Sequence, residues 1–159
     1  SDPDWDLRRI EPYCGYETYD FNVVTPPFDD RWGWKAPAGT VIGDAWHRFM
    51  VRMLELVESI RICEQALDRY PTAQGSHRVE LPRHLPAGEA YAETECPRGQ
   101  MGFYVVGSPG KSMVPLRVRA RSSSFCNLSV TDAICRDCLI ADVPAIVGSI
   151  DIVMGEIDR

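Results

Sequence analysis

The longest periodic pattern of apolar residues lies between positions 44 and 70. Apolar side chains recur there at intervals of three and four residues, which places them on one face of a helix. Those side chains are Phe49, Met53, Leu56, Val57, Ile60, Cys63, Leu67 and Tyr70. Asp44 is suited to cap the amino end of this helix, and Pro71 prevents its continuation. The pattern therefore predicts a helix over residues 44–70 whose apolar face packs in a core.

A period-two pattern follows in the segment 100–120, after a polar and proline-rich connector over residues 71–99. Two runs of strand-forming residues flank the loop 107–112, and in the second run Leu116 and Val118 alternate with arginines. We predict a β-hairpin here, with the arginines on its solvent side. The Gly-Ser-Pro-Gly-Lys-Ser loop is too short for a phosphate-binding loop and is followed by a strand instead of a helix, so we interpret it as a turn.

The two ends of the chain carry weaker patterns. Residues 1–42 are rich in aromatic residues, proline and glycine without a period, and we interpret them as an ordered, irregular segment that lies on a larger body. In residues 124–159 we predict a short helix capped by Ser124 that continues to about Cys138, and a second helix capped by Asp142 with Pro144 in its first turn. Together these elements predict a mainly α fold with a small β-hairpin, which is an α+β class.

The carboxyl-terminal segment 140–159 is apolar but interrupted by charge. Its apolar residues are dense enough to be buried, so the charged residues Asp151, Glu156, Asp158 and Arg159 should be carried into or beside a core. Burying a carboxylate costs several kcal/mol unless it is paired or hydrogen-bonded. The segment therefore indicates either a functional site or a specific structural network.

Composition narrows the class of protein. The net charge of −6 argues against nucleic acid as the main partner. No signal-peptide pattern is visible, and the apolar run 139–154 is too short and too charged to cross a bilayer. Six scattered cysteines need no disulfide framework in a chain of 159 residues, which favours a reducing compartment. Because the chain begins at Ser1 without a methionine, we interpret it as a fragment or processed piece.

Two groups of potentially reactive side chains carry little functional signal. Cys135 and Cys138 form only half of a tetrahedral zinc site, and no second pair of matching spacing exists. We interpret them as coincidentally placed. The histidines His47, His77 and His84 lie in a helix and in the polar connector without a partnered nucleophile, so we interpret them as ordinary exposed residues.

The turn around Arg98 is more informative. Pro97 and Gly99 fix a tight backbone bend that presents Arg98 directly before a strand. A guanidinium held by a rigid turn is suited to a buried carboxylate or to the polar head of a ligand. A surface turn without function is the alternative interpretation.

Several sequence blocks in order along the chain resemble a known family. They are Asp6–Arg9, Pro12–Glu17, Gly43–Asp44, Ile62–Leu67, Pro97–Gly99, Gly102–Tyr104, Arg117–Ala120, Gly148–Asp151 and Gly155–Arg159. The chain resembles the C-terminal half of the large quinone-site subunit, the D-type or 49-kilodalton-type subunit, of the proton-pumping NADH–quinone oxidoreductase, respiratory complex I. This resemblance implies a fold similar to the C-terminal part of the large subunit of nickel–iron hydrogenases, mainly helical with small β-elements.

The same resemblance implies what the carboxyl-terminal segment does. Hydrogenases hold their metal with two Cys-x-x-Cys pairs, and Val153 and Glu156 stand where the second pair would supply its thiolates. Valine cannot bind a metal, so no nickel site is completed here, and Cys135 and Cys138 come too early to substitute. In the quinone-reducing relatives the vacated pocket becomes part of the quinone chamber. Its wall here is implied to include Asp151, Val153, Met154, Glu156 and Arg159, with Arg98 and Asp158 in a charge network.

The implied assembly is a membrane-associated, proton-translocating NADH–quinone oxidoreductase. Quinone is its substrate, and neither metal nor flavin is expected in this chain. The expected partners are the small subunit that carries the terminal iron–sulfur cluster and a neighbouring C-type subunit of the peripheral arm, on the cytoplasmic side of the cell membrane. No catalytic residue is assigned, because the family's quinone-contacting His and Tyr belong to the N-terminal half, so the isolated chain should be inactive.

Three alternatives to this function stay open. The chain belongs instead to a related complex fed by another donor, such as a reduced deazaflavin or ferredoxin; or it is only a structural or assembly module of such a complex; or it is part of a nickel–iron hydrogenase. The subunits that admit electrons would distinguish the first of these, a bound quinone analogue the second, and nickel in the whole complex the third.

Overall fold

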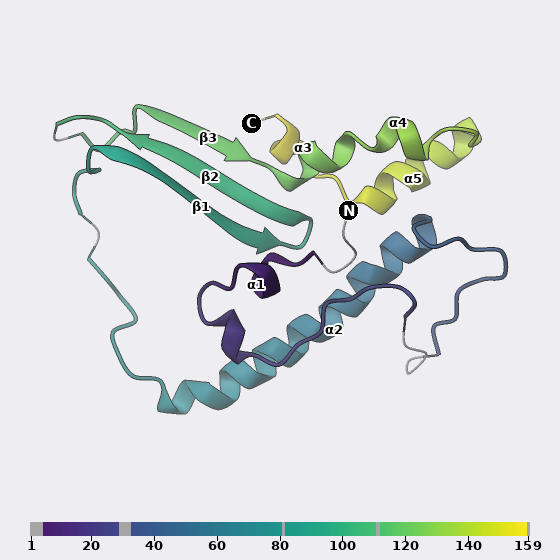
Figure 1. The fold of residues 1–159 in the computed structure, drawn as a ribbon, viewed down its shortest axis with the longest axis horizontal. Helices are drawn as coiled ribbons and strands as arrows, with labels where there is room; N and C mark the ends of the chain where they lie inside the picture. The colour runs from purple at the N-terminus through teal and green to yellow at the C-terminus, as the bar shows by residue number, and fades with distance from the viewer. Residues whose placement is uncertain (1–4, 29–32, 81, 111, 159) are drawn as a thin grey trace.

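A computed structural model describes residues 5–28, 33–80, 82–110 and 112–158 (Figure 1). Within these residues the helices and strands are α1 (Leu7–Ile10), α2 (Ala45–Arg69), β1 (Gly88–Cys96), β2 (Gly99–Gly107), β3 (Arg117–Arg121), α3 (Ser123–Leu128), α4 (Thr131–Ile134), α5 (Val143–Ile150) and α6 (Met154–Ile157). Short 3₁₀ turns occupy Tyr16–Thr18, Tyr70–Thr72 and Ile140–Asp142. Helices thus accompany one small antiparallel sheet, as the α+β prediction requires.

The long helix α2 occupies the segment in which the apolar pattern predicts it. The Asp44 carboxylate accepts a hydrogen bond from the His47 backbone N–H at 2.9 Å, which satisfies one of the free donors at the helix start. Beyond Arg69 the backbone tightens into the 3₁₀ turn Tyr70–Thr72, where Pro71 ends the α-helical pattern.

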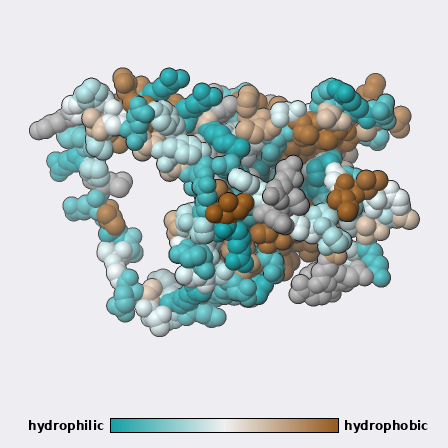
Figure 2. All heavy atoms as spheres, viewed as in Figure 1, coloured by the Kyte–Doolittle hydropathy of each residue, from teal (hydrophilic) through white to brown (hydrophobic). Residues whose placement is uncertain are grey.

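The apolar face of α2 is exposed in this chain, so the prediction that it packs in a core is wrong. Phe49, Leu56, Ile60 and Leu67 have between 54% and 71% of their surface exposed. Apolar side chains also remain visible on the face of the molecule in Figure 2. A helical period fixes which residues share a face, but it does not fix which layer covers that face.

The sheet contains one strand more than the sequence predicts. The strands lie in the order β1-β2-β3, and both neighbouring pairs are antiparallel. β2 and β3 form the expected hairpin around the 107–112 loop, whereas β1 lies in the segment interpreted as a connector. Leu116, which precedes β3, and Val118 are mostly exposed, so the predicted half-buried face is wrong at these two positions, whereas Ala120 is half-buried. The three-stranded sheet has no second layer over this part of β3 among the described residues.

Two predicted helix caps at the carboxyl-terminal end are corrected. Ser122, not Ser124, caps α3, because its hydroxyl accepts a hydrogen bond from the Phe125 N–H at 3.2 Å. The helix predicted to continue to about Cys138 breaks into α3 and α4. Asp142 makes no side-chain capping bond to α5, whose first turn contains Pro144 instead.

The irregular amino-terminal segment lies along α2 (Figure 1). The backbone N–H of Asn22 donates to the Glu58 carboxylate at 2.9 Å, and the N–H of Asp20 donates to the Gln65 side chain at 2.9 Å. Side chains of α2 therefore satisfy backbone donors that an irregular segment cannot pair by itself.

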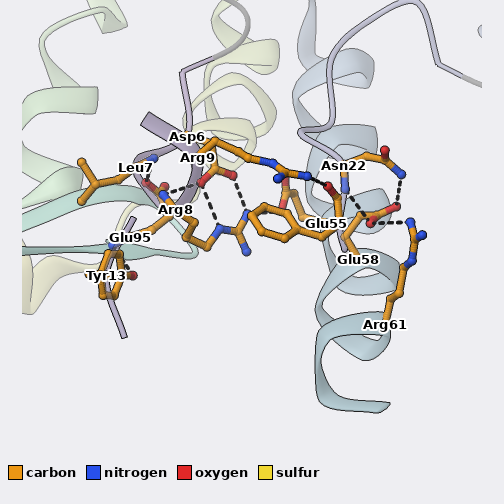
Figure 3. A network of polar contacts seen from close by, with 11 residues as sticks. Asp6, Leu7, Arg8, Arg9, Tyr13, Asn22, Glu55, Glu58, Arg61 and Glu95 are labelled. Carbon is orange, nitrogen blue, oxygen red and sulfur yellow. Dashed lines mark hydrogen bonds and ion pairs between the residues drawn. The ribbon is translucent and has the colours of Figure 1, made fainter. Parts of the chain in front are cut away.

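A polar network holds α1 between α2 and β1 (Figure 3). Arg8 forms ion pairs with Asp6 at 2.6 Å and with Glu55 of α2 at 3.1 Å. Glu95 of β1 accepts a hydrogen bond from the Leu7 N–H at 3.1 Å. Burial raises the pKa of both Glu55 and Glu95 above the ordinary value, although Arg8 opposes that rise. The network therefore joins three elements through partly desolvated charges.

Glu95→Gln should stabilise the protein at neutral pH. A carboxyl group whose folded pKa is raised contributes stability that is complete below its unfolded value of 4.5 and is lost as the pH rises through the folded value. Glutamine keeps an oxygen for the Leu7 N–H but carries no charge to desolvate. We expect the melting temperature to rise at pH 7.5 by roughly 2 °C, the effect of about 0.5–1 kcal/mol in a domain of this size.

Thermal unfolding at pH 7.5 and pH 4.5 measures this difference. The gain should shrink at the lower pH, because the pKa of Glu95 lies above 4.5 and the wild-type carboxyl group then carries less charge to desolvate. Glu64→Gln, on an exposed position of α2, is the matched control and should change neither melting temperature. A loss of stability in Glu95→Gln at pH 7.5 would show that the charge of Glu95 is net favourable.

Candidate functional site

The backbone changes direction at Asp151, immediately after α5. Asp151 adopts a left-handed conformation with φ of 57°, which is uncommon for a residue with a side chain. Its backbone carbonyl accepts a hydrogen bond from Arg98 Nε at 3.0 Å, and its carboxylate oxygen Oδ2 lies 3.6 Å from the same nitrogen. The structure thus brings together Arg98 and Asp151, two of the residues that the sequence predicts for the site.

Arg98 is positioned by the turn that joins β1 and β2. Cys96 pairs with Gly99 across the strands, so that only Pro97 and Arg98 form the loop. Gly99 has φ of 110°, a conformation that a side chain would strain. The Arg98 carbonyl also accepts a hydrogen bond from Asn127 Nδ2 of α3 at 2.8 Å. The turn is therefore fixed from both sides, and the guanidinium points to the end of α5.

Two further arginines from α2 reach the same place, and the sequence interpretation missed their role. Arg52 Nε lies 3.7 Å from the Asp151 carboxylate, and its guanidinium also donates to the Ser149 carbonyl. Arg48 Nε donates to the Ser149 hydroxyl at 2.9 Å. Burial lowers the pKa of Arg52, an effect that the Asp151 carboxylate opposes and the positive charges of Arg48 and Arg98 reinforce. Their spacing of four residues on one predicted helix is the only signal that the sequence offered.

Beyond Asp151 the tail lies against α3. The Glu156 carboxylate accepts a hydrogen bond from the Ser124 N–H at 3.0 Å, and the Val153 N–H donates to the Ser124 hydroxyl at 3.3 Å. Hydrogen bonds from the Ser124 hydroxyl and N–H hold the pKa of Glu156 below its ordinary value. Val153 is half-buried, and Met154 has 68% of its surface exposed. An apolar pair thus stands between two anchored carboxylates.

The expectation that the charged residues of the tail lie in or beside a core is wrong in part. Asp158 is exposed, and Arg159 lies outside the described residues. Asp151 and Glu156 are only half-buried, and each is hydrogen-bonded or paired. A half-buried carboxylate that has a partner does not pay the full desolvation cost. The positions of Asp151 and Glu156 are therefore a weaker sign of function than deep burial would have been.

The serines Ser122, Ser123 and Ser124 are buried, and Ser122 and Ser124 bond the tail, although the sequence interpretation treated Ser124 only as a cap. The Ser122 hydroxyl donates to the Glu156 carbonyl at 2.6 Å. The Ser123 hydroxyl lies 3.0 Å from the Gly99 carbonyl and 3.1 Å from that of Gln100. Three consecutive serines directly after a strand were the available signal.

The other candidate residues are distributed elsewhere. His47 is buried and its Nδ1 lies 2.8 Å from the Asp44 carboxylate, so its interpretation as an exposed residue is wrong. His77 and His84 are exposed, Cys135 is half-buried and Cys138 is exposed. Within residues 5–28, 33–80, 82–110 and 112–158, no three His, Cys, Asp or Glu side chains are arranged to hold a metal ion.

An apolar groove of about 380 Å³ lies at the amino end of α2. Its lining residues are Gly33, Trp34, Lys35, Trp46, Phe49, Met50 and Met53, and none of them belongs to the carboxyl-terminal tail. The groove therefore gives no evidence of a closed pocket at the tail. The described part of the chain contains no helix with the length and apolar content that a membrane span requires.

Comparison with solved structures defines the class of protein. The chain is similar to a chain in the "Structure of the membrane-bound sulfane sulfur reductase (MBS), an archaeal respiratory membrane complex", with a TM-score of 0.78 and 32% sequence identity. The match covers 98% of this chain and 39% of that one. The fold is thus that of a subunit found in a respiratory membrane complex.

Sequence comparison gives the family. The family model described as "Respiratory-chain NADH dehydrogenase, 49 Kd subunit" matches residues 1–84 and 77–159, and the chain belongs to this family. The D-type subunit of the NADH-quinone oxidoreductase of Pelodictyon phaeoclathratiforme is 47% identical over 98% of this chain and 37% of its own length. A D-type subunit of the NADH-quinone oxidoreductase of Solibacter usitatus is 43% identical over 98% of this chain and 38% of its own length. The chain therefore spans a little over a third of the length of these relatives.

Proposed function

We propose that this chain forms part of the wall of the quinone chamber in a membrane-associated, proton-translocating NADH–quinone oxidoreductase. The proposal is carried by the tail Asp151–Glu156. Arg98 binds its first residue, Asp151, where the chain leaves α5, and Val153 and Met154 lie between the anchored carboxylates of Asp151 and Glu156. D-type subunits of NADH-quinone oxidoreductases match nearly the whole chain, which supports the same assignment.

The chemistry of the tail fits a quinone better than a metal. Val153 and Met154 offer apolar, adaptable surface to a flat ring and a prenyl tail. By the resemblance to nickel–iron hydrogenases, Val153 stands where those proteins place a thiolate, and its side chain has no atom that binds nickel. A nickel–iron centre therefore does not fit these residues.

The charge network gives the site a means to respond to the reaction. A quinone that accepts two electrons also takes up two protons, so the charge of the bound ring changes during turnover. The Asp151 carboxylate lies 3.7 Å from Arg52 Nε and 3.6 Å from Arg98 Nε, so a change at the ring alters the field at all three groups. Asp158, which is exposed, is proposed to extend this network beyond Glu156.

The partners of the chain are proposed on the same basis. The electrons reach the quinone from an iron–sulfur cluster in the adjoining small subunit, and a neighbouring C-type subunit completes the peripheral arm. The assembly is proposed to attach to the cytoplasmic side of the cell membrane. The chain alone lacks the partner surfaces of the chamber, so we expect it to be inactive by itself.

A second candidate is a related complex with a different electron donor or acceptor. The 32% identity to a chain of the membrane-bound sulfane sulfur reductase supports it, because this fold is compatible with more than one overall reaction. The subunits that admit electrons distinguish the two candidates, since this part of the chain does not reach the donor.

Val153→Trp in the assembled complex tests the proposal. The larger side chain should occupy the space that we propose for the quinone and raise the KM for decylubiquinone about tenfold, the effect of about 1.4 kcal/mol of lost binding. Ile140→Trp is the matched control, because Ile140 is 90% exposed and precedes α5. Electron transfer from NADH to ferricyanide should be unchanged in both variants. An unchanged KM in Val153→Trp would count against the quinone chamber.

A further inference from the structure

We propose that Ser122 and Ser124 are positioning residues that set the depth of Val153 and Met154 in the chamber wall. The consequence for quinone rests on the proposed function, whereas the seating of the tail on these serines does not. Both side chains are nearly inaccessible, with exposed fractions of 4% and 1%. Their hydroxyls therefore face the protein and not the solvent.

Ser124 holds the tail through its side chain and its backbone. Its hydroxyl accepts the Val153 N–H at 3.3 Å, and its own N–H donates to the Glu156 carboxylate at 3.0 Å. The Ser124 hydroxyl and N–H together hold the pKa of the Glu156 carboxylate below its ordinary value, so both groups of this serine act on the tail. Alanine at this position would remove the acceptor of the Val153 N–H and leave the backbone bond to Glu156 in place.

Ser122 links the tail to the start of α3. Its hydroxyl accepts the Phe125 N–H at 3.2 Å as the helix cap and donates to the Glu156 carbonyl at 2.6 Å. The position of Glu156 is thereby tied to the first turn of α3. Because Asn127 of the same helix donates to the Arg98 carbonyl, α3 connects the tail with the turn that holds Asp151.

The tail depends on α3 because the hydrogen bonds within its own backbone do not include the Val153 N–H. Asp151 N–H donates to the Gly148 carbonyl at 3.1 Å, and Glu156 N–H donates to the Val153 carbonyl at 3.1 Å. Between them Val153 is extended, with φ of −110° and ψ of 123°, and its N–H is directed to Ser124 instead of to a helix carbonyl. The orientation of Val153 is thus set by a side chain of α3.

Hydrogen exchange in the assembled complex tests the seating directly. In Ser124→Ala we expect the amides of residues 151–158 to exchange about fivefold faster, the change that the loss of one typical hydrogen bond produces. The KM for decylubiquinone should rise about threefold to tenfold while kcat stays within about twofold, because the wall is loosened but no reacting group is removed. Transfer from NADH to ferricyanide should be unchanged.

Two serines serve as controls. Ser123→Ala changes an equally buried hydroxyl that bonds the Gly99 and Gln100 carbonyls, and Ser129→Ala changes an exposed one that bonds the Cys126 carbonyl. Both should leave exchange at residues 151–158 as in the wild type. Equal loosening by Ser123→Ala would mean general destabilisation and would overturn the proposal.

The outcomes also separate this inference from the proposed function. Faster exchange with an unchanged quinone KM would support the seating and contradict the quinone chamber. Unchanged exchange in Ser124→Ala would overturn the seating whatever the KM does. If Ser124→Ala does not assemble, Glu156→Ala removes the carboxylate that accepts the Ser124 N–H and should also speed exchange at residues 151–158; unchanged exchange there would equally overturn the inference.

Discussion

Arg98→Ala should lower quinone reduction by the assembled complex about 100-fold. Arg98 is hydrogen-bonded to the Asp151 carbonyl and ion-paired with its carboxylate, and Asp151 is held in a left-handed conformation at the point where the tail leaves α5. Without the guanidinium, the backbone at Asp151 is free to relax and carries Val153 and Met154 with it. A displacement of about 1 Å at an active site is enough to cost about 100-fold in rate.

Steady-state quinone reduction by NADH measures the effect, with transfer to ferricyanide as the reference for intact electron entry. Arg98→Lys should recover only part of the rate, because lysine keeps the charge but not the planar set of donors. Arg136→Ala is the control, because the Arg136 side chain is 72% exposed and forms an ion pair with Asp132 of α4 instead of with the tail. This variant should leave the rate unchanged. A wild-type rate in Arg98→Ala would exclude Arg98 from the site.

Phe21→Ala should be the most destabilising substitution of a single side chain, at about 3–5 kcal/mol. Phe21 is fully buried, with the guanidinium groups of Arg8 and Arg9 at 4.9 Å and 4.4 Å from its ring centre. Its removal opens a cavity and also takes away a partner of two cations that anchor α1. Urea unfolding followed by tryptophan fluorescence measures the change in free energy of unfolding.

Leu67→Ala is the control for Phe21→Ala. Leu67 belongs to the predicted apolar face of α2 but is 71% exposed, so its truncation should change the free energy of unfolding by no more than about 0.5 kcal/mol. A sequence pattern alone would give both substitutions a similar cost. A loss of several kcal/mol in Leu67→Ala would show that this face is covered in solution.

Local signals in the sequence predicted the elements that depend on neighbouring residues. The apolar period and Asp44 predicted α2, and the Pro97–Gly99 block predicted the turn that presents Arg98. β1 was missed because its sequence, Gly-Glu-Ala-Tyr-Ala-Glu-Thr-Glu-Cys, is rich in alanine and glutamate, which are poor strand formers. It becomes a strand by pairing with β2 along its whole length, which is information that the segment does not contain.

The sequence likewise predicted only those residues of the candidate site that have a local signal. Arg98 was predicted from its rigid turn and Asp151 from its place in the apolar tail, and the structure brings the two into contact. Arg52 and Ser124 were missed because they reach the tail from elements far away in the sequence. The buried His47 was misjudged for a similar reason, since Phe28 packs against it from the amino-terminal segment.

A structure of the assembled complex with a bound quinone analogue tests the central claim most directly. We predict that the ring or the first prenyl units contact Val153 or Met154, with Asp151 and Arg98 still joined behind them. An analogue bound elsewhere, with residues 151–158 facing bulk water, would contradict the assignment of this tail to the quinone chamber.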